Sequence, residues 1–99
     1  MDKIEAIRIA RKYKSVLRDF IKIDNMYLFG SHALNSGRDD SDIDIAIVVS
    51  EIPDDYFAVN PMLWKLRRQV DDRIEPILIE KENDRSGFLE DIKQYGIEI

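Results

Sequence analysis

The sequence of 99 residues contains no cysteine. Disulfide bonds and thiolate metal sites are therefore excluded, and a reducing cytoplasm is the expected compartment. The sequence also lacks any apolar run near the ~20 residues that a membrane-spanning helix needs. Its N-terminal stretch, MDKIEAIRIARKYK, interleaves acids with bases and has no apolar segment typical of a signal peptide. These absences predict a cytoplasmic protein without a membrane segment.

A net positive charge is missing as well. The 15 Lys and Arg residues are outnumbered by 20 Asp and Glu residues, for a formal charge of −5 and a pI of about 4.8. A generic binder of double-stranded DNA or RNA needs a positive surface, so long nucleic acid is not expected as the main partner. A nucleotide is still compatible with this balance, because divalent cations can neutralise carboxylates around a polyphosphate.

Proline and glycine are scarce, with 3 and 4 residues, while 44% of the residues are apolar and 35% are charged. Such a composition is typical of a folded globular protein. The length suits one modest core, which predicts a single domain over residues 1–99 with no room for a separate acceptor-binding domain.

The apolar patterns predict an α/β (α+β) fold, in which a small mixed sheet is flanked by helices. The expected elements are a helix over about 3–22, strands over 26–29, 42–49 and 74–79, a helical region from 53 to about 71, and a helix over 84–95. The run over 42–49 is β-branched and almost wholly apolar, as in a central strand covered on both faces. Pro76 cannot donate a hydrogen bond to a neighbouring strand, so its strand is expected at an edge or beside a bulge.

Three helical stripes and two caps can be predicted from the spacing. Asp2 is the expected N-cap of the first helix, and Gly96 the expected C-terminal cap of the last. The residues expected to face the core are Ile4, Ile7, Ala10, Tyr13, Val16 or Leu17 and Phe20 in the first helix, Met62, Leu63, Leu66 and Val70 in the second, and Phe88, Leu89 and Ile92 in the third.

Two aspartates, Asp42 and Asp44, interrupt the otherwise apolar strand. Being two residues apart, they project from the same face, about 6.5–7 Å apart along the strand. Two ionised carboxylates beside a core repel each other, and a bound divalent cation removes this cost. Oxygen ligands on a rigid strand suit Mg²⁺, and two ions ~3.5–4 Å apart can hold the attacking and leaving oxygens of a phosphoryl transfer. Solvated strand-end acids or turn caps are the structural alternative.

Gly30 and Ser31 end an apolar strand and open a turn, and ten residues separate them from Asp42. Exposed backbone N–H groups and a hydroxyl at such a turn suit the outer phosphates of a nucleoside triphosphate. Without a Cβ, Gly30 lets a phosphate approach the backbone closely. A Gly-Ser turn alone is more simply an ordinary strand exit, but its combination with the paired aspartates is far more specific.

The segment YLFGSHALNSGRDDSDIDIAIVV resembles the motif region of the DNA polymerase β-like nucleotidyltransferases. It is most similar to the minimal nucleotidyltransferase group, including its MntA-like antitoxins, whose pattern reads G-S-x10-D-x-D. The match includes Ser41 before the first aspartate, and with the elements on either side it extends over the whole chain. The resemblance implies that Gly30, Ser31, Arg38 and Ser41 contact the nucleotide.

The family also implies a third carboxylate on a later strand, which completes the metal site and activates the acceptor hydroxyl. The matching position is Glu75, where many relatives have Asp, and Asp72 is the fallback. Asp42, Asp44 and Glu75 are thus the expected catalytic and metal-binding residues, with Glu75 as a metal-supported general base. For Glu75, a solvent-facing acid on an edge strand is the structural alternative.

The loop between the two halves of the motif departs from the family. Many relatives have Arg and Gly where this chain has Leu34 and Asn35. Loss of the Arg weakens the expected grip on the triphosphate, whereas Asn can adopt the left-handed conformation that a Gly provides. Arg38 or His32 are candidates to supply the missing polarity. A purely structural role is the favoured interpretation of His32.

The resemblance implies transfer of a nucleoside monophosphate, AMP from ATP, to a hydroxyl with release of pyrophosphate and with two Mg²⁺ ions. Small relatives are commonly encoded beside a helical HEPN-type partner and act as antitoxins, some by adenylylating a tyrosine of that toxin. A HEPN-type partner, a homo-oligomer or both are therefore expected. The alternatives are a homodimer that modifies a small molecule, as aminoglycoside nucleotidyltransferases do, and a weakly catalytic domain that neutralises its partner by binding alone.

The second helical region also contains a tryptophan and several basic residues. Trp64 lies off the apolar stripe and could mark a surface that contacts a partner. A half-buried residue of the helix is at least as good an interpretation of Trp64. The basic residues alternate with core residues and precede two aspartates, which favours a solvated face with self-paired charges. These basic residues are Lys65, Arg67, Arg68 and Arg73.

Overall fold

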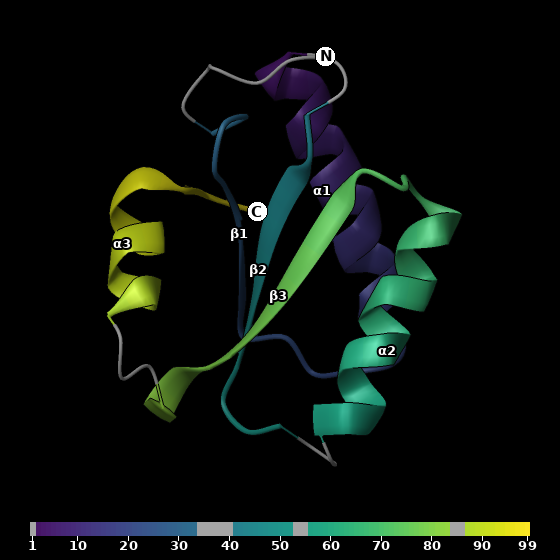
Figure 1. The fold of residues 1–99 in the computed structure, drawn as a ribbon, viewed down its shortest axis with the longest axis vertical. Coiled ribbons are helices and arrows are strands. Elements are labelled where there is room, and N and C mark those ends of the chain that lie inside the picture. Colours follow the sequence, from purple (N-terminus) through teal and green to yellow (C-terminus); the bar gives the residue numbers. More distant parts are fainter. Residues whose placement is uncertain (1, 34–40, 53–55, 84–86) are drawn as a thin grey trace.

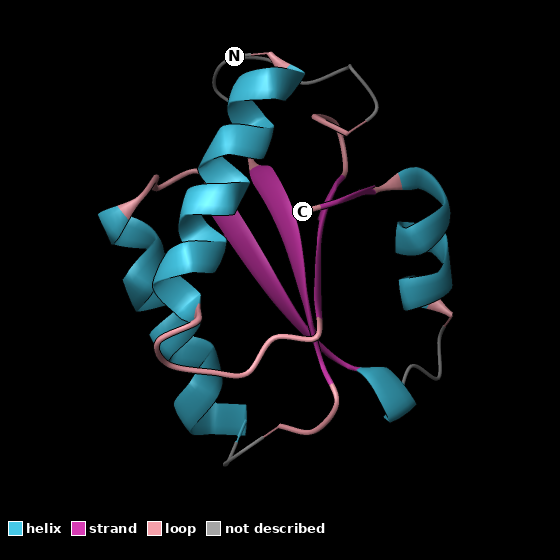
Figure 2. Cartoon of the chain, turned by 180° about the vertical axis from the view of Figure 1, so that it is seen from behind, coloured by secondary structure: helices cyan, strands magenta, loops and turns pink. Residues whose placement is uncertain are grey.

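The computed structural model describes residues 2–33, 41–52, 56–83 and 87–99. A four-stranded sheet in the order β3-β2-β1-β4 lies between two layers of helices (Figures 1 and 2). Helices α1 and α2 cover one face, and α3 covers part of the other. The elements are α1 (Lys3–Leu17), β1 (Asn25–Phe29), β2 (Ile43–Val49), α2 (Tyr56–Leu66), the 3₁₀ turn η1 (Arg67–Gln69), β3 (Ile74–Glu80), the 3₁₀ turn η2 (Lys81–Asn83), α3 (Phe88–Tyr95) and β4 (Ile97–Glu98). The predicted small mixed sheet flanked by helices is confirmed.

Strand β2 is the centre of this sheet, as predicted. It pairs antiparallel with β1 and parallel with β3. Every residue of β2 is buried except Asp44, which is partly buried. Side chains alternate between the faces, so Ile43, Ile45 and Ile47 join the core beneath α1 and α2. Ala46 and Val48 join the smaller core beneath α3, and the alternation places Asp44 on that α3 face.

Helix α1 begins at the predicted cap, where the Asp2 carboxylate accepts a 2.9 Å hydrogen bond from the Glu5 backbone N–H. Its buried residues are Ala6, Ala10, Tyr13 and Leu17. Three predicted core residues are wrong, since the exposed fraction is 78% for Ile4 and 56% for Phe20 in this segment, and 38% for Phe88 at the start of α3. Ile4 lies two residues before Ala6, about 200° around the helix and so on the opposite side. Phe20 lies beyond the helix, which ends at Leu17 and not near residue 22.

Helix α2 is shorter than predicted and gives way to η1 after Leu66. Its core residues are Val59, Leu63 and Leu66, while Met62 and Val70 are only partly buried. The buried Tyr13 hydroxyl donates a 2.8 Å hydrogen bond to the Leu63 carbonyl oxygen. This bond joins α1 to α2 on the same face of the sheet.

The C-terminal elements contain an unpredicted strand. β4 pairs antiparallel with β1 and places Ile97 beside Leu28. Gly96 caps α3 as predicted, although its backbone is extended. A Cβ at Gly96 would lie 2.6 Å from the Ile92 carbonyl oxygen and 3.0 Å from that of Leu28, so this close approach of α3 to β1 needs glycine. At the opposite side of the sheet, β3 is an edge strand, as the presence of Pro76 predicts.

Candidate active site

The sheet register brings three acidic residues to one end of its α3 face. In the parallel pair of β2 and β3, Asp44 lies opposite Glu75. Asp42 immediately precedes β2, two residues before Asp44, and therefore projects to the same face. Glu75 shares its face with Ile79, which belongs to the core beneath α3. Asp72 lies before β3 and is exposed, so Glu75 is the residue that the register places opposite Asp44.

The three carboxyl groups influence one another. Burial raises the pKa of Asp44 above its ordinary value and the negative charge of Asp42 raises it further, while Glu75 and His32 lower it. Burial also raises the pKa of Glu75, to which the charges of Asp42 and Asp44 add. Ionisation of Asp44 and Glu75 beside the Asp42 carboxylate is therefore unfavourable. A shared proton or a bound cation relieves this repulsion.

The donor set fits Mg²⁺. In the parts of the chain that are described, no cluster of three or more Asp, Glu or His side chains is arranged to hold a metal ion. Mg²⁺ does not require such a cluster, because it commonly binds one or two carboxylates together with substrate phosphates and water. The carboxylates of Asp42, Asp44 and Glu75 are oxygen donors of this kind.

Gly30 brings the preceding turn against this carboxylate group. Phe29, the last residue of β1, pairs with Asp44 in the register. The next residue, Gly30, has a φ of 75°, in the left-handed region that favours glycine. A Cβ at Gly30 would overlap with Asp44 Oδ2 and lie 3.1 Å from its Cγ. The backbone at the Gly30-Ser31 turn therefore lies directly beside the Asp44 carboxylate.

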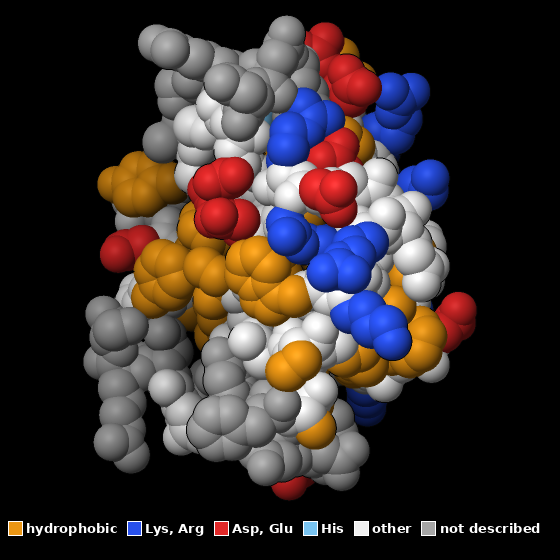
Figure 3. All heavy atoms as spheres, turned by 45° about the vertical axis from the view of Figure 1, so that its right-hand side comes forward, with side chains coloured by type: hydrophobic (Ala, Val, Ile, Leu, Met, Phe, Trp, Pro, Cys, Tyr) orange, Lys and Arg blue, Asp and Glu red, His pale blue; other side chains and the backbone are white. Residues whose placement is uncertain are grey.

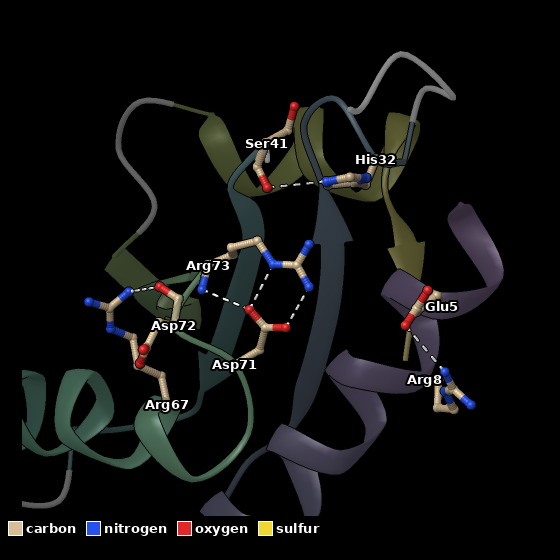
Figure 4. Close-up of polar contacts among 8 residues, drawn as sticks. All are labelled: Glu5, Arg8, His32, Ser41, Arg67, Asp71, Asp72 and Arg73. Atoms are coloured by element: carbon tan, nitrogen blue, oxygen red, sulfur yellow. Dashed lines mark hydrogen bonds and ion pairs between the residues drawn. The ribbon is translucent and has the colours of Figure 1, made fainter. Parts of the chain in front are cut away.

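His32 joins the two ends of the motif loop (Figure 4). Its side chain is only 2% exposed, and its Nε2 lies 3.4 Å from the Ser41 carbonyl oxygen, so it is the nitrogen that donates. The contact closes the chain between the Gly30-Ser31 turn and the start of β2. Sequence reasoning missed this contact, because a backbone carbonyl leaves no signature in the side-chain pattern. Arg38, Leu34 and Asn35 lie outside the described residues.

Of the basic residues in and after α2, Arg67 and Arg73 contact their neighbours. The Asp71 carboxylate accepts hydrogen bonds from Arg73 Nε at 2.9 Å and Nη2 at 2.7 Å, which confirms the predicted self-pairing there. The Arg67 guanidinium lies 4.7 Å from the Trp64 ring centroid, and Lys65 and Arg68 are exposed. Figure 3 shows basic and acidic side chains interspersed on this side of the molecule, without a large patch of one sign.

Comparison with known proteins assigns this chain to a family. The family model described as "Polymerase beta, Nucleotidyltransferase" matches residues 11–99. The chain belongs to this nucleotidyltransferase family. The match confirms the resemblance noted in the motif region, and with it a nucleotidyltransferase activity.

Individual relatives support membership of the minimal nucleotidyltransferase group. A protein of Methanocaldococcus jannaschii, provisionally named a protein adenylyltransferase, is 29% identical over 97% of this chain and 100% of its own length. A chain in the crystal structure of a toxin–antitoxin with AMP-PNP matches with a TM-score of 0.68 and 25% identity, covering 90% of this chain and 70% of that one. A structure of the tri-AMPylated Shewanella oneidensis HEPN toxin in complex with MNT antitoxin matches with a TM-score of 0.64 and 25% identity, over 94% and 70%. None of the described helices is long and apolar enough to span a membrane.

Proposed function

We propose that this nucleotidyltransferase moves AMP from ATP to a hydroxyl group of a protein partner, with Mg²⁺, and releases pyrophosphate. The acceptor in this proposal is a tyrosine of a HEPN-type toxin, for which the chain acts as antitoxin. The observation that carries the proposal is the register of the parallel strands, which sets Glu75 beside Asp44 under the Gly30-Ser31 turn.

The comparisons support the choice of nucleotide and acceptor. One structural relative was solved with AMP-PNP, an analogue of ATP. The matched relative from M. jannaschii is provisionally named a protein adenylyltransferase. In the other structural relative, a HEPN toxin carries three AMP groups in complex with MNT antitoxin. Each of these facts concerns the relative, and together they favour a protein hydroxyl over a drug-like acceptor.

The proposed roles combine the positions of the described residues with the family resemblance of the motif. The backbone N–H groups and the hydroxyl at Gly30-Ser31 hold the outer phosphates, and Ser41, at the other end of the loop, adds a polar contact to the nucleotide. Arg38 completes that set in the sequence-based hypothesis. Asp42, Asp44 and Glu75 would hold the metal ions, which supply charge neutralisation to the triphosphate and to the acceptor oxygen when bound.

Glu75 is suited to accept the acceptor's proton. Burial and the neighbouring carboxylates raise its pKa in the metal-free protein, and a carboxylate within hydrogen-bond reach of a hydroxyl can act as its general base. As Glu75 takes the hydroxyl proton, the acceptor oxygen forms a bond to the α-phosphorus. The bond from the α-phosphorus to the bridging oxygen breaks, and pyrophosphate leaves with that electron pair. The AMP group is then esterified to the acceptor.

The test uses ATP labelled at the α-phosphate, MgCl₂ and a HEPN-type protein as acceptor. We expect the label to appear on the acceptor, to be absent when ATP carries the label at the γ-phosphate, and to disappear with EDTA. The Asp42→Asn/Asp44→Asn double variant should abolish labelling. Glu75→Gln should lower it strongly, whereas Asp72→Asn, at the neighbouring exposed acid, should leave it unchanged.

The other functions predict different results. A tight complex with the HEPN-type protein that never acquires label would identify an antitoxin that acts by binding alone. Label on an aminoglycoside but not on protein would identify a small-molecule nucleotidyltransferase. Either result would contradict the proposed acceptor.

A further inference from the structure

The side chain of Arg67, in the turn that follows α2, lies along the free edge of strand β3. Its Nη1 donates a 3.1 Å hydrogen bond to the Ile74 carbonyl oxygen and a second hydrogen bond to the Asp72 carbonyl oxygen (Figure 4). The guanidinium carbon, Cζ, lies over the Trp64 ring, 4.7 Å from the ring centroid. Arg67 Nε is buried without a hydrogen-bond partner. An arginine in this arrangement is partly desolvated and is held by backbone carbonyl groups and an aromatic ring.

These carbonyl groups belong to the start of the strand that carries Glu75. Backbone groups alternate in direction along a strand. The Arg73 carbonyl points to β2, where it accepts a 2.8 Å hydrogen bond from the Ile43 N–H. The Ile74 carbonyl therefore points to the outer edge, where β3 has no neighbouring strand among the described residues. Arg67 occupies this edge one residue before Glu75.

The same turn is held from the other side by a second arginine. The Asp71 carboxylate accepts 2.9 Å hydrogen bonds from the backbone N–H and the Nε of Arg73. The Asp71 backbone N–H in turn donates a 2.8 Å hydrogen bond to the Arg67 carbonyl oxygen. These hydrogen bonds hold the segment from Arg67 to Ile74 together. Its last residues are also bound to β2, because the Arg73 carbonyl oxygen accepts from the N–H of Ile43, the residue between Asp42 and Asp44.

We infer that Arg67 is a positioning residue for the active site: it holds the first residues of β3 in register and thereby sets Glu75 opposite Asp44. The inference rests on the proposed function, in which Glu75 binds metal and accepts a proton. Arg67 itself donates only to carbonyl oxygens among the described residues and does not touch the carboxylate group. Groups that orient metal ligands in this way typically affect metal affinity or activity by about 10–100-fold.

The variants that test this inference are Arg67→Gln and Arg67→Lys, with Arg68→Gln as the matched control. Arg68 is the next residue of the same turn and is exposed. Both hydrogen bonds come from Nη1; lysine retains the charge but loses the planar guanidinium that lies over Trp64 and directs this nitrogen. Arg67→Lys also serves as the test if Arg67→Gln does not fold. Thermal unfolding of each variant checks that it is folded.

The first readout is amide hydrogen exchange of Ile43 in the protein without metal or nucleotide. We expect exchange at this amide to be faster in both Arg67 variants and unchanged in Arg68→Gln, with protection retained between β1 and β2. The second readout is the affinity for Mn²⁺, measured by electron paramagnetic resonance with AMP-PNP present. We expect a decrease of about 10-fold or more for Arg67→Gln, a decrease for Glu75→Gln, and no additional decrease when both are combined.

The outcomes separate the inference from the function on which it rests. If Glu75→Gln weakens Mn²⁺ binding but the Arg67 variants change neither readout, the inference is overturned and the proposed function stands. If the Arg67 variants speed exchange at Ile43 while Glu75→Gln leaves Mn²⁺ binding unchanged, the positioning stands and the metal role of Glu75 falls. If the decreases in Mn²⁺ affinity multiply in the double variant, Arg67 acts independently of Glu75, and the inference is overturned.

Discussion

Gly30→Ala is the substitution that tests most sharply how the Gly30-Ser31 turn is placed against Asp44. Two costs are expected. Gly30 has a φ of 75°, and a residue with a Cβ in this left-handed region costs ~1–2 kcal/mol. The new Cβ would also overlap with Asp44 Oδ2 and lie 3.1 Å from its Cγ, so the carboxylate must rotate away or the turn must move.

Gly87→Ala is the matched control, because it carries the first cost without the second. Gly87 has a φ of 73°, and a Cβ there would have no atom within 4 Å. Both variants should lose ~1–2 kcal/mol of stability through backbone strain, which lowers the Tm by at least about 4 °C in a chain of this size. Only Gly30→Ala displaces the carboxylate, and a misplacement of about 1 Å at a reacting centre costs ~10²-fold in rate.

The assay measures AMP transfer from α-labelled ATP, together with thermal unfolding, for the wild type and both variants. We expect Gly87→Ala to transfer AMP at nearly the wild-type rate and Gly30→Ala to lose ~10²-fold or more. Equal activity of the two variants, with both folded, would refute the argument that Gly30 is needed for the approach of the turn to Asp44.

The remaining predictions concern stability and can be measured by urea or thermal unfolding. Asp71→Asn should lose about 1 kcal/mol of stability at neutral pH. Arg73 lowers the pKa of Asp71 in the folded protein, so the stability that Asp71 contributes is fully present above its unfolded pKa of ~3.9. That stability is lost as the pH falls through the folded pKa. The difference between wild type and variant should therefore shrink in acid, and a difference that grows would contradict this sign. Tyr13→Phe removes the hydroxyl that joins α1 to α2 and should cost about 1 kcal/mol, whereas a stability equal to wild type would show that the bond contributes nothing. Leu17→Ala removes a fully buried side chain and should cost ~2–5 kcal/mol of stability. Ile4→Ala removes a side chain that is 78% exposed and should change stability by no more than about 0.5 kcal/mol. Similar losses for the two variants would show that the buried stripe of α1 is misassigned.

The predictions from sequence succeeded where one pattern had one physical explanation. The run over 42–49 is β-branched and almost wholly apolar apart from its two aspartates, which predicts a central strand, and β2 is one. Asp2 is an N-cap because a side-chain oxygen satisfies an otherwise unpaired N–H group at the start of α1. Pro76 lies in the edge strand because it lacks the N–H that an inner strand would need.

The predictions failed where local pattern does not determine the structure. Both Ile4 and Ala6 could begin a helical stripe, and the packing of α1 on the sheet selects the stripe through Ala6. A two-residue strand such as β4 has no periodicity to detect, and its partner β1 is about 70 residues away in the chain. The contacts of His32 and Arg67 end on backbone carbonyl oxygens, which the order of side chains does not encode.

For the candidate site, too, local spacing could be predicted from the sequence, whereas contacts between distant segments could not. The spacing of Asp42 and Asp44 on one strand follows from the sequence, since alternation alone puts them on one face. The partner of Asp44 on the neighbouring strand depends on the register of a parallel pair, which is set by contacts between distant segments. The sequence favoured Glu75 over Asp72 only through the family resemblance, and the register of the parallel pair places Glu75 opposite Asp44.

The most direct test of the account is the anomalous scattering of Mn²⁺ in crystals of the protein grown with AMP-PNP. We predict a metal peak bound by the carboxylates of Asp42 and Asp44 with Glu75 beside it, and the outer phosphates of the nucleotide against the Gly30-Ser31 turn. A nucleotide bound away from this turn, or Mn²⁺ bound without any of the three carboxylates, would contradict the proposed active site.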